Sequence, residues 1–425
     1  MGKQRSIFTG LAIAMIYLSS INPIYGKTTS LFSMTGEAST SYEYDSNIYR
    51  TGSNEVDDSV MQVSPTFALS TNSKIIRIRT NYNGVFRRYV ANGDEDHQMN
   101  MISLSAQTDN EAAIYGHASM NYRTSEDIRG GSSKTVQAND VPDSFDTTGG
   151  QFGFTVQNLQ RKIGFESLIN FTKTRYIESQ LGHRNTDTQG TRFTGRYTIS
   201  GRSNVYLFVD RKKVLFTESS SGTNDNLEMK YGAGGVWLVS GKLRGNAELA
   251  YNTKNAIEPN TQVASYSGLY TKMSLSWSRK KFSKYTISIS RKSTENVDVG
   301  VLNNVQTGMS FIWDHEFSKR MKLFVKFDNS INQAAGDNES FFYEFSPIFT
   351  YFFSPRLNTS IAIVSKQKTG DDDTLSNNVF NPKVSYKFLR DFLVSTEFKF
   401  DHSTATREES VTTWSSIFTF SYKLR

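Results

Sequence analysis

Residues 412–424 read TTWSSIFTFSYKL, and the alternation in this stretch decides the fold class. Successive side chains of an extended strand point to opposite sides, so every second residue belongs to the same side. One side here carries Trp414, Phe418, Phe420, Tyr422 and Leu424. The opposite side carries small polar residues and Lys423, with Ile417 as the exception. An aromatic side backed by a polar side is typical of a wall between lipid and water.

The same alternation recurs from residue 57 to the last residue, in pairs of strands joined by tight turns. Asn, Gly, Ser and Pro supply the turn geometry. The turns lie at 71–73, 109–110, 158–160, 201–203, 240–241, 279–281, 317–319, 354–356 and 389–391. Longer polar stretches, such as 124–149 and 177–190, separate the pairs.

This pattern of strands, turns and loops predicts an all-β protein, a transmembrane antiparallel outer-membrane β-barrel of about 18–20 strands. Nine turns imply eighteen strands, and strands at 36–44 and at the C-terminus bring the number to twenty. The number should be even because both ends of such a chain lie on the periplasmic side. Pro65, Pro347 and Pro382 fall inside strands, where we expect β-bulges. A soluble β-sandwich or propeller, with its apolar sides buried, is the alternative.

The N-terminus predicts export from the cytoplasm. Residues 1–26 are typical of a secretory signal peptide, with Lys3 and Arg5 before an apolar run at 7–18. That run is too short for a spanning helix, which needs about 20 apolar residues. We expect a short periplasmic lead-in at 27–35, the barrel at 36–425, and a location in the outer membrane of a Gram-negative cell. The mean hydropathy of -0.48 fits a barrel, because only every second strand residue faces lipid.

The charged strand residues predict a water-filled inner face. Met321, Leu323 and Val325 alternate with Lys322 and Lys326. A charge facing lipid near the midplane would cost about 2–4 kcal/mol, so these charges should face the lumen. The predicted substrate pathway is lined by Arg77, Arg79, Arg123, Arg192, Arg196, Arg244, Lys272, Lys322, Lys326, Tyr115 and Tyr270.

The predicted inner face also holds Lys284, Lys383 and Lys387, and fewer acids: Glu166, Glu248, Asp328 and Glu397. An excess of basic residues on a pore wall favours anions. The alternative is that these charges form salt-bridge ladders that stiffen the wall. The inward tyrosines could stack on sugar rings or could only fill space.

No arrangement of residues predicts chemistry. Asp401 and His402 are adjacent in a strand and therefore point to opposite faces, so they cannot easily pair. Asp45-Ser46-Asn47 offers oxygen donors for calcium, but the glycine and glutamate of an EF-hand loop are missing, which favours a turn. The chain has no cysteine. We expect no catalytic residue, no metal site, no cofactor and no enzymatic activity.

Residues 41–50 read SYEYDSNIYR and are followed by Val63-Ser64-Pro65. This opening resembles that of the Putative β-barrel porin 2 family. The resemblance implies a β-barrel of the outer membrane linked to secretion of exopolysaccharide or capsule. It also implies that the barrel carries the polymer outward beside a periplasmic polysaccharide-export partner. The remaining partners that we expect are outer-membrane lipid and lipopolysaccharide, with no nucleic acid.

We therefore predict an outer-membrane conduit for export of an exopolysaccharide or capsular polysaccharide. A general or anion-preferring diffusion porin is the alternative. Such porins narrow their channel with an inward loop, and the candidate here is the stretch 124–149, with Glu126, Asp127, Asp140, Asp143 and Asp146. A structural or adhesive barrel is a third hypothesis.

Overall fold

The computed structural model describes residues 32–424 except 50–54, 72, 74, 110–111, 128–142, 159, 178–183, 218–224, 258–264, 281, 295–303, 335–338, 371–373 and 406–407. The predicted signal peptide at 1–26 lies outside these residues. Within them the only helix is the short 3₁₀ helix η1 (Gly93–Glu95). No helix in the described part of the chain is long and apolar enough to cross a membrane.

The strands are β1 (Phe32–Asp45), β2 (Asp58–Thr71), β3 (Ile76–Tyr89), β4 (His97–Thr108), β5 (Ile114–Asp127), β6 (Asp143–Gln157), β7 (Ile163–Tyr176), β8 (Thr186–Ser200), β9 (Ser203–Phe216), β10 (Asn226–Ser240), β11 (Leu243–Ala256), β12 (Tyr266–Lys280), β13 (Ser283–Thr294), β14 (Asn304–Ser318), β15 (Met321–Ala334), β16 (Glu339–Phe352), β17 (Leu357–Thr369), β18 (Thr374–Leu389), β19 (Phe392–Ala405) and β20 (Glu408–Leu424).

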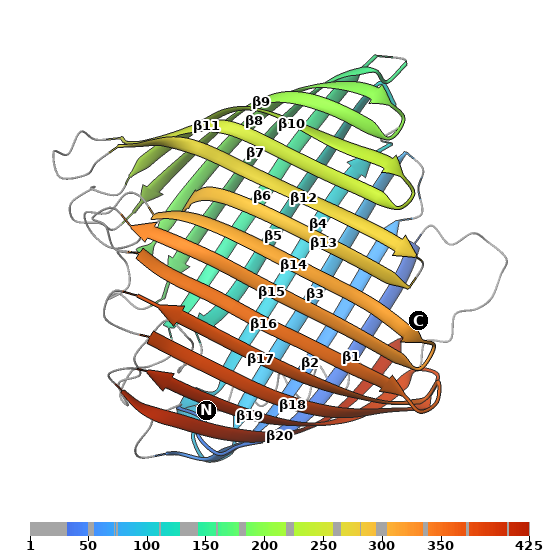
Figure 1. The fold of residues 1–425 in the computed structure, drawn as a ribbon, viewed down its shortest axis with the longest axis vertical. Coiled ribbons are helices and arrows are strands. Elements are labelled where there is room, and N and C mark those ends of the chain that lie inside the picture. Colours follow the sequence, from blue (N-terminus) through green and yellow to red (C-terminus); the bar gives the residue numbers. More distant parts are fainter. Residues whose placement is uncertain are drawn as a thin grey trace.

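All strands belong to one closed barrel (Figure 1). Each strand pairs antiparallel with the next one, and β1 closes the ring by pairing with β20 from Gly36↔Leu424 to Asp45↔Ser415. The 20-stranded sheet confirms the barrel class and the upper end of the predicted strand number. All nine predicted turns join the strand pairs expected of them. Closure matters because it leaves no sheet edge with unpaired backbone groups.

The two rims of the barrel differ. One rim carries the tight turns, such as the one between Ser200 and Ser203, and both Phe32 and Leu424 lie at this rim. We call it the turn rim. The connections at the opposite rim, the loop rim, are longer in general, for example between β5 and β6. Short turns on the periplasmic side and longer loops outside are typical of outer-membrane barrels.

One boundary and three bulges differ from the prediction. Residues 32–35, which we assigned to a lead-in, belong to β1. The register of each proline-bearing strand with the following strand continues unchanged across Pro65, Pro347 and Pro382, so the predicted bulges were wrong. The following strand leaves a short gap in its pairing beside each proline. The preceding strand pairs with the proline itself, as in Ala38↔Pro65. A missing N–H therefore costs local ladder bonds without an extra residue in the strand.

The strand register separates the two faces of the barrel, because directly paired residues share a face. Phe418 pairs with Tyr42, which pairs with Met61, and these side chains are 42%, 49% and 53% exposed. They belong to an apolar belt on the outer face. On the other face Arg192 of β8 reaches Glu248 of β11 across two intervening strands, at 2.8 Å. Three strand spacings measure about 14 Å, so such a contact closes on the concave, inner face.

Candidate channel wall

All eleven predicted lining residues occupy inward positions of the register. Arg192 pairs with Asp210, Asp210 with Lys230 and Lys230 with Asn252, so one row of polar side chains runs across four strands. The inner face also carries the other predicted lining residues, namely Lys322, Lys326, Tyr270, Lys272, Arg77, Arg79, Tyr115, Arg123, Arg196 and Arg244. Their position facing inward agrees with the alternation of the sequence. Their role as a substrate pathway stays a prediction.

The densest part of the inner wall lies on β8–β12. Glu248 is its centre: one carboxylate oxygen, Oε1, accepts hydrogen bonds from Arg192 Nη2 and from Tyr206 Oη, both at 2.8 Å. The Arg192 guanidinium also lies over the Phe208 ring, 4.0 Å from its centroid. Lys272 pairs with Glu248 in the register of β11 and β12. A planar guanidinium held by a carboxylate and an aromatic face is fixed in orientation.

Two glycines make room for the rings of this cluster. A Cβ atom at Gly234 would lie 2.4 Å from the Tyr206 ring, and one at Gly232 would lie 2.7 Å from Phe208. At Gly232 the backbone oxygen of Leu249 would also be only 2.5 Å away. The stretch Gly232-Ala233-Gly234-Gly235 therefore lets aromatic side chains lie flat along the wall.

A second group of charges adjoins this cluster toward the loop rim. Glu228 accepts a hydrogen bond from Asn252 Nδ2 at 2.8 Å and pairs with Lys230 at 3.3 Å. The Lys230 ammonium lies 5.1 Å from the centroid of the Tyr270 ring. Glu228 and Asn252 are buried. We define the β8–β12 cluster as Arg192, Tyr206, Phe208, Lys230, Glu248 and Tyr270.

The inner wall on β14–β19 is built differently, from ion pairs between nearby positions. Lys326 contacts Asp328 on its own strand and Glu344 on the next strand, the latter at 3.3 Å. Lys322 pairs with Glu316. Lys383 pairs with Glu397 at 3.0 Å. These contacts support the alternative that part of the lumen charge forms ladders within the wall.

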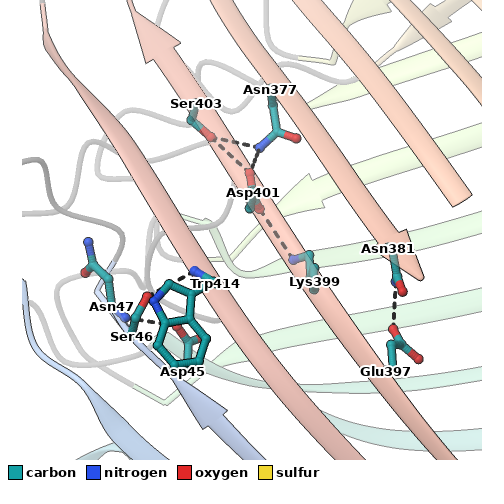
Figure 2. Close-up of polar contacts among 10 residues, drawn as sticks. All are labelled: Asp45, Ser46, Asn47, Asn377, Asn381, Glu397, Lys399, Asp401, Ser403 and Trp414. Carbon is teal, nitrogen blue, oxygen red and sulfur yellow. Dashed lines mark hydrogen bonds and ion pairs between the residues drawn. The ribbon is translucent and has the colours of Figure 1, made fainter. Parts of the chain in front are cut away.

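Figure 2 shows the end of this ladder on β18 and β19. Asp401 accepts a hydrogen bond from Asn377 Nδ2 at 2.7 Å and lies 3.4 Å from Lys399. Asn381 Nδ2 donates to Glu397 at 2.7 Å. His402 lies on the other face and contacts Thr412 Oγ1 at 2.8 Å. Asp401 and His402 thus point apart, as predicted.

Several inward basic residues at the turn rim have no carboxylate partner. Within the described part of the chain, Arg77, Arg79, Arg196 and Arg244 have no acid within ion-pair distance, and all four lie in the turn-rim ends of their strands. Arg79 donates to Asn81 Oδ1 instead, at 2.9 Å. The Arg196 guanidinium lies over Gly164, where a Cβ atom would be 3.4 Å away. We call these four side chains the turn-rim arginines. They add positive charge to this end of the inner wall.

The candidate constriction loop, residues 124–149, is strand at both ends, and its residues 128–142 lie outside the described part of the chain. Four of its five acids, Glu126, Asp127, Asp143 and Asp146, lie in the strands β5 and β6. Asp127 pairs with Asp143 in the strand register, and Asp146 occupies an outward position beside the inward Thr147. Asp140 lies outside the described residues. The acids were taken for loop residues because polar side chains continue up both strands.

The seam between β1 and β20 contains the tripeptide considered for calcium. The backbone N–H of Asn47 donates to Asp45 Oδ1 at 3.0 Å, which is an Asx turn, and Ser46 Oγ accepts from the backbone N–H of Trp414 at 3.0 Å (Figure 2). This geometry is that of a turn, which was the alternative to a calcium site. The described residues contain no group of three His, Asp or Glu side chains that could hold a metal ion.

Sequence reasoning missed several members of the wall: Tyr206, Phe208, Lys230 and Glu344. Residues 205–210 read VYLFVD, where aromatic residues and an acid alternate with aliphatic ones, so period-two alternation could have revealed Tyr206 and Phe208. Both sides of that strand are apolar, which hides the inner face. An additional signal for the inner face is that the aromatic residues of this strand pair with glycines of the next strand.

A closed antiparallel barrel with an apolar outer belt and a charged inner wall defines a porin-like channel of the outer-membrane type. The chain belongs to a family of such proteins: the family model described as Putative beta-barrel porin 2 matches residues 24–381. No curated protein matches the sequence.

Solved structures share the architecture. The ferric enterobactin receptor PfeA from Pseudomonas aeruginosa, in complex with enterobactin, is similar with a TM-score of 0.55 and 7% identity, over 92% of this chain and 81% of that one. A variant of the FrpB iron transporter from Neisseria meningitidis gives a TM-score of 0.54 with 8% identity, over 92% and 82%. The copper transporter OprC gives 0.52 with 9% identity, over 94% and 82%. At these identities the likeness shows the fold alone.

Proposed function

We propose that this protein is a conduit in the outer membrane through which an anionic exopolysaccharide or capsular polysaccharide leaves the cell. The observation that carries the proposal is the set of turn-rim arginines, which face the lumen without a carboxylate partner. In outer-membrane barrels the rim with short turns is the periplasmic one. Unpaired positive charge at that entrance attracts carboxylate or sulfate groups that arrive from the periplasm.

The β8–β12 cluster supports the same cargo further along the wall. Sugar rings stack on aromatic side chains and bond to fixed polar groups, and Tyr206 and Tyr270 stand beside Arg192 and Lys230. The cluster is held by its own contacts, so little ordering is needed when a chain passes. A periplasmic polysaccharide-export partner would deliver the polymer at the turn rim.

The direct test is secretion by cells that carry Arg196→Glu together with Arg244→Glu. We expect several-fold less secreted polymer per cell, with the same amount of heat-modifiable barrel in the outer membrane fraction. Arg202→Glu is the matched control because Arg202 lies in the β8–β9 turn of the same rim and is exposed outside the wall. Normal secretion in the well-assembled double variant would reject steering by these arginines. Normal secretion in a deletion strain would reject export itself.

An anion-preferring diffusion porin is the second candidate, since the same arginines would select small anions. Conductance of the purified barrel in planar bilayers separates the two functions. A porin conducts chloride steadily and its loss leaves polymer secretion unchanged, whereas a conduit is needed for secretion whatever its conductance.

A further inference from the structure

The outer face carries a basic surface that the channel function does not use. Lys173 and Arg175 of β7 and Arg211 and Lys213 of β9 point outward near the loop rim. Lys213 and Phe171 both pair with Gln189, so cation and ring belong to one row of the outer face. Below them the face is apolar, with Phe193 58% and Leu207 69% exposed. We call the four basic side chains the β7–β9 basic patch.

Three of these cations have no ion-pair partner among the described residues. Arg175 pairs with Asp187 of the intervening strand β8. No carboxylate in the described part of the chain lies within ion-pair distance of Lys173, Arg211 or Lys213. Two strand spacings separate β7 from β9, about 10 Å, so these long side chains can converge on one group between them.

Other outward arginines near the loop rim are satisfied by the protein. Arg88 lies 3.7 Å from Asp96, and Arg291 donates to Thr307 Oγ1 at 3.5 Å. The contrast shows that the β7–β9 basic patch is a local feature of one sector and is not a general ring of rim charges.

The position of the patch along the membrane normal indicates the kind of ligand that it binds. Lys173 and Lys213 are each three residues from the loop-rim end of their strands, about 8 Å for a tilted strand, and Arg211 is two residues deeper. Cations at the border of the hydrocarbon are costly unless they snorkel or meet an anion. Guanidinium forks and ammonium groups bind phosphate oxygens strongly there. The apolar side chains underneath suit acyl chains.

We propose that the β7–β9 basic patch binds a phosphorylated, acylated lipid of the outer leaflet. The phosphate lies among Lys173, Arg211 and Lys213, and the acyl chains run down over Phe171, Phe193 and Leu207. The site holds a lipid at one sector of the barrel wall. This inference rests on the proposed outer-membrane location and not on the nature of the cargo.

The test is binding of lipid A with both phosphates, compared with dephosphorylated lipid A, to the full-length barrel in detergent by native mass spectrometry. We expect the phosphorylated lipid to bind at least about tenfold more tightly, as charge-assisted contacts require. The variant K173Q/R211Q/K213Q should bind both lipids equally. The control R161Q/R202Q/K242Q removes as many charges from the turn rim and should keep the preference.

Two results would overturn the proposal. Equal binding of both lipids by the unaltered protein would overturn it. This result needs no variant, so it can be obtained even if the triple variant fails to assemble. A phosphate preference that persists in a heat-modifiable K173Q/R211Q/K213Q barrel would place the lipid elsewhere. Inorganic phosphate should not displace the bound lipid, because the acyl chains contribute to its affinity.

Discussion

The inner walls of β8–β12 and of β14–β19 carry similar residues but connect them differently. On β8–β12 a single carboxylate, Glu248, joins Arg192 from three strands away and Tyr206 from two strands away. On β14–β19 each ion pair among the described residues joins residues on one strand or on neighbouring strands, as Lys383 and Glu397 do. Glycines under aromatic rings occur in the first wall, where Gly232 and Gly234 let Phe208 and Tyr206 lie flat.

The difference separates a stiffening role from a binding role. A ladder of neighbouring ion pairs neutralises itself and follows the strand register, so it can be extended along any polar wall. A cluster that reaches across strands and combines cations with rings concentrates groups that recognise a ligand. Equal charge content therefore does not imply equal function, and the two walls should respond differently to substitution.

The largest effect is expected from Gly232→Leu. Its Cβ would meet the Leu249 carbonyl oxygen at 2.5 Å and the Ala250 Cβ at 2.6 Å, so the wall of β9–β11 must deform. Overpacking of this kind costs about 1–3 kcal/mol or more. The heat-modifiable fraction of the membrane-inserted protein should fall sharply. Ala233→Leu, one residue away on the outer face, should assemble normally, and equal loss in both variants would contradict the close packing.

Outward substitutions should not distinguish the two walls. Leu249→Arg in β11 and Phe327→Arg in β15 both place a charge in hydrocarbon near the middle of a strand, at a cost of about 2–4 kcal/mol. Urea unfolding of the barrel in lipid vesicles measures this cost. Ser330→Arg, on the inner face of β15, is the control and should change stability little. A large cost at Ser330 would mean that the assignment of the two faces is wrong.

Ion selectivity should distinguish the walls. Glu248→Gln leaves Arg192 without its carboxylate beside Lys272, so the permeability of anions relative to cations should rise about two- to threefold. Glu397→Gln frees only Lys383 and should act more weakly. Reversal potentials in a salt gradient give both ratios. Identical shifts would remove the distinction between cluster and ladder.

The smallest effect is expected from Lys383→Met. Its ion pair with Glu397 is 40% exposed on the lysine side, and pairs with such access to water contribute about 0–1 kcal/mol. Urea unfolding in vesicles should therefore shift only slightly. A loss of several kcal/mol would show that the ladder is a principal source of stability for that wall.

The sequence by itself determined the architecture. Alternation such as that of residues 412–424 sets which side chains face lipid, and the tight turns set the pairing of the strands. It also placed the lining residues, from Arg77 to Lys326, on the inner face, because a period of two depends only on the extended backbone. The missed details were local, such as the start of β1 at Phe32 and the continuous register at the prolines.

Only the tertiary structure decided which lining charges are paired. Arg192 and Arg196 lie two residues apart and look equivalent in sequence, yet the first meets Glu248 and the second meets no described carboxylate. The physical reason is that register and curvature bring β8 within reach of β11, and no local pattern encodes contacts between strands so distant in sequence. The same closure collects Lys173, Arg211 and Lys213 on one sector of the outer face.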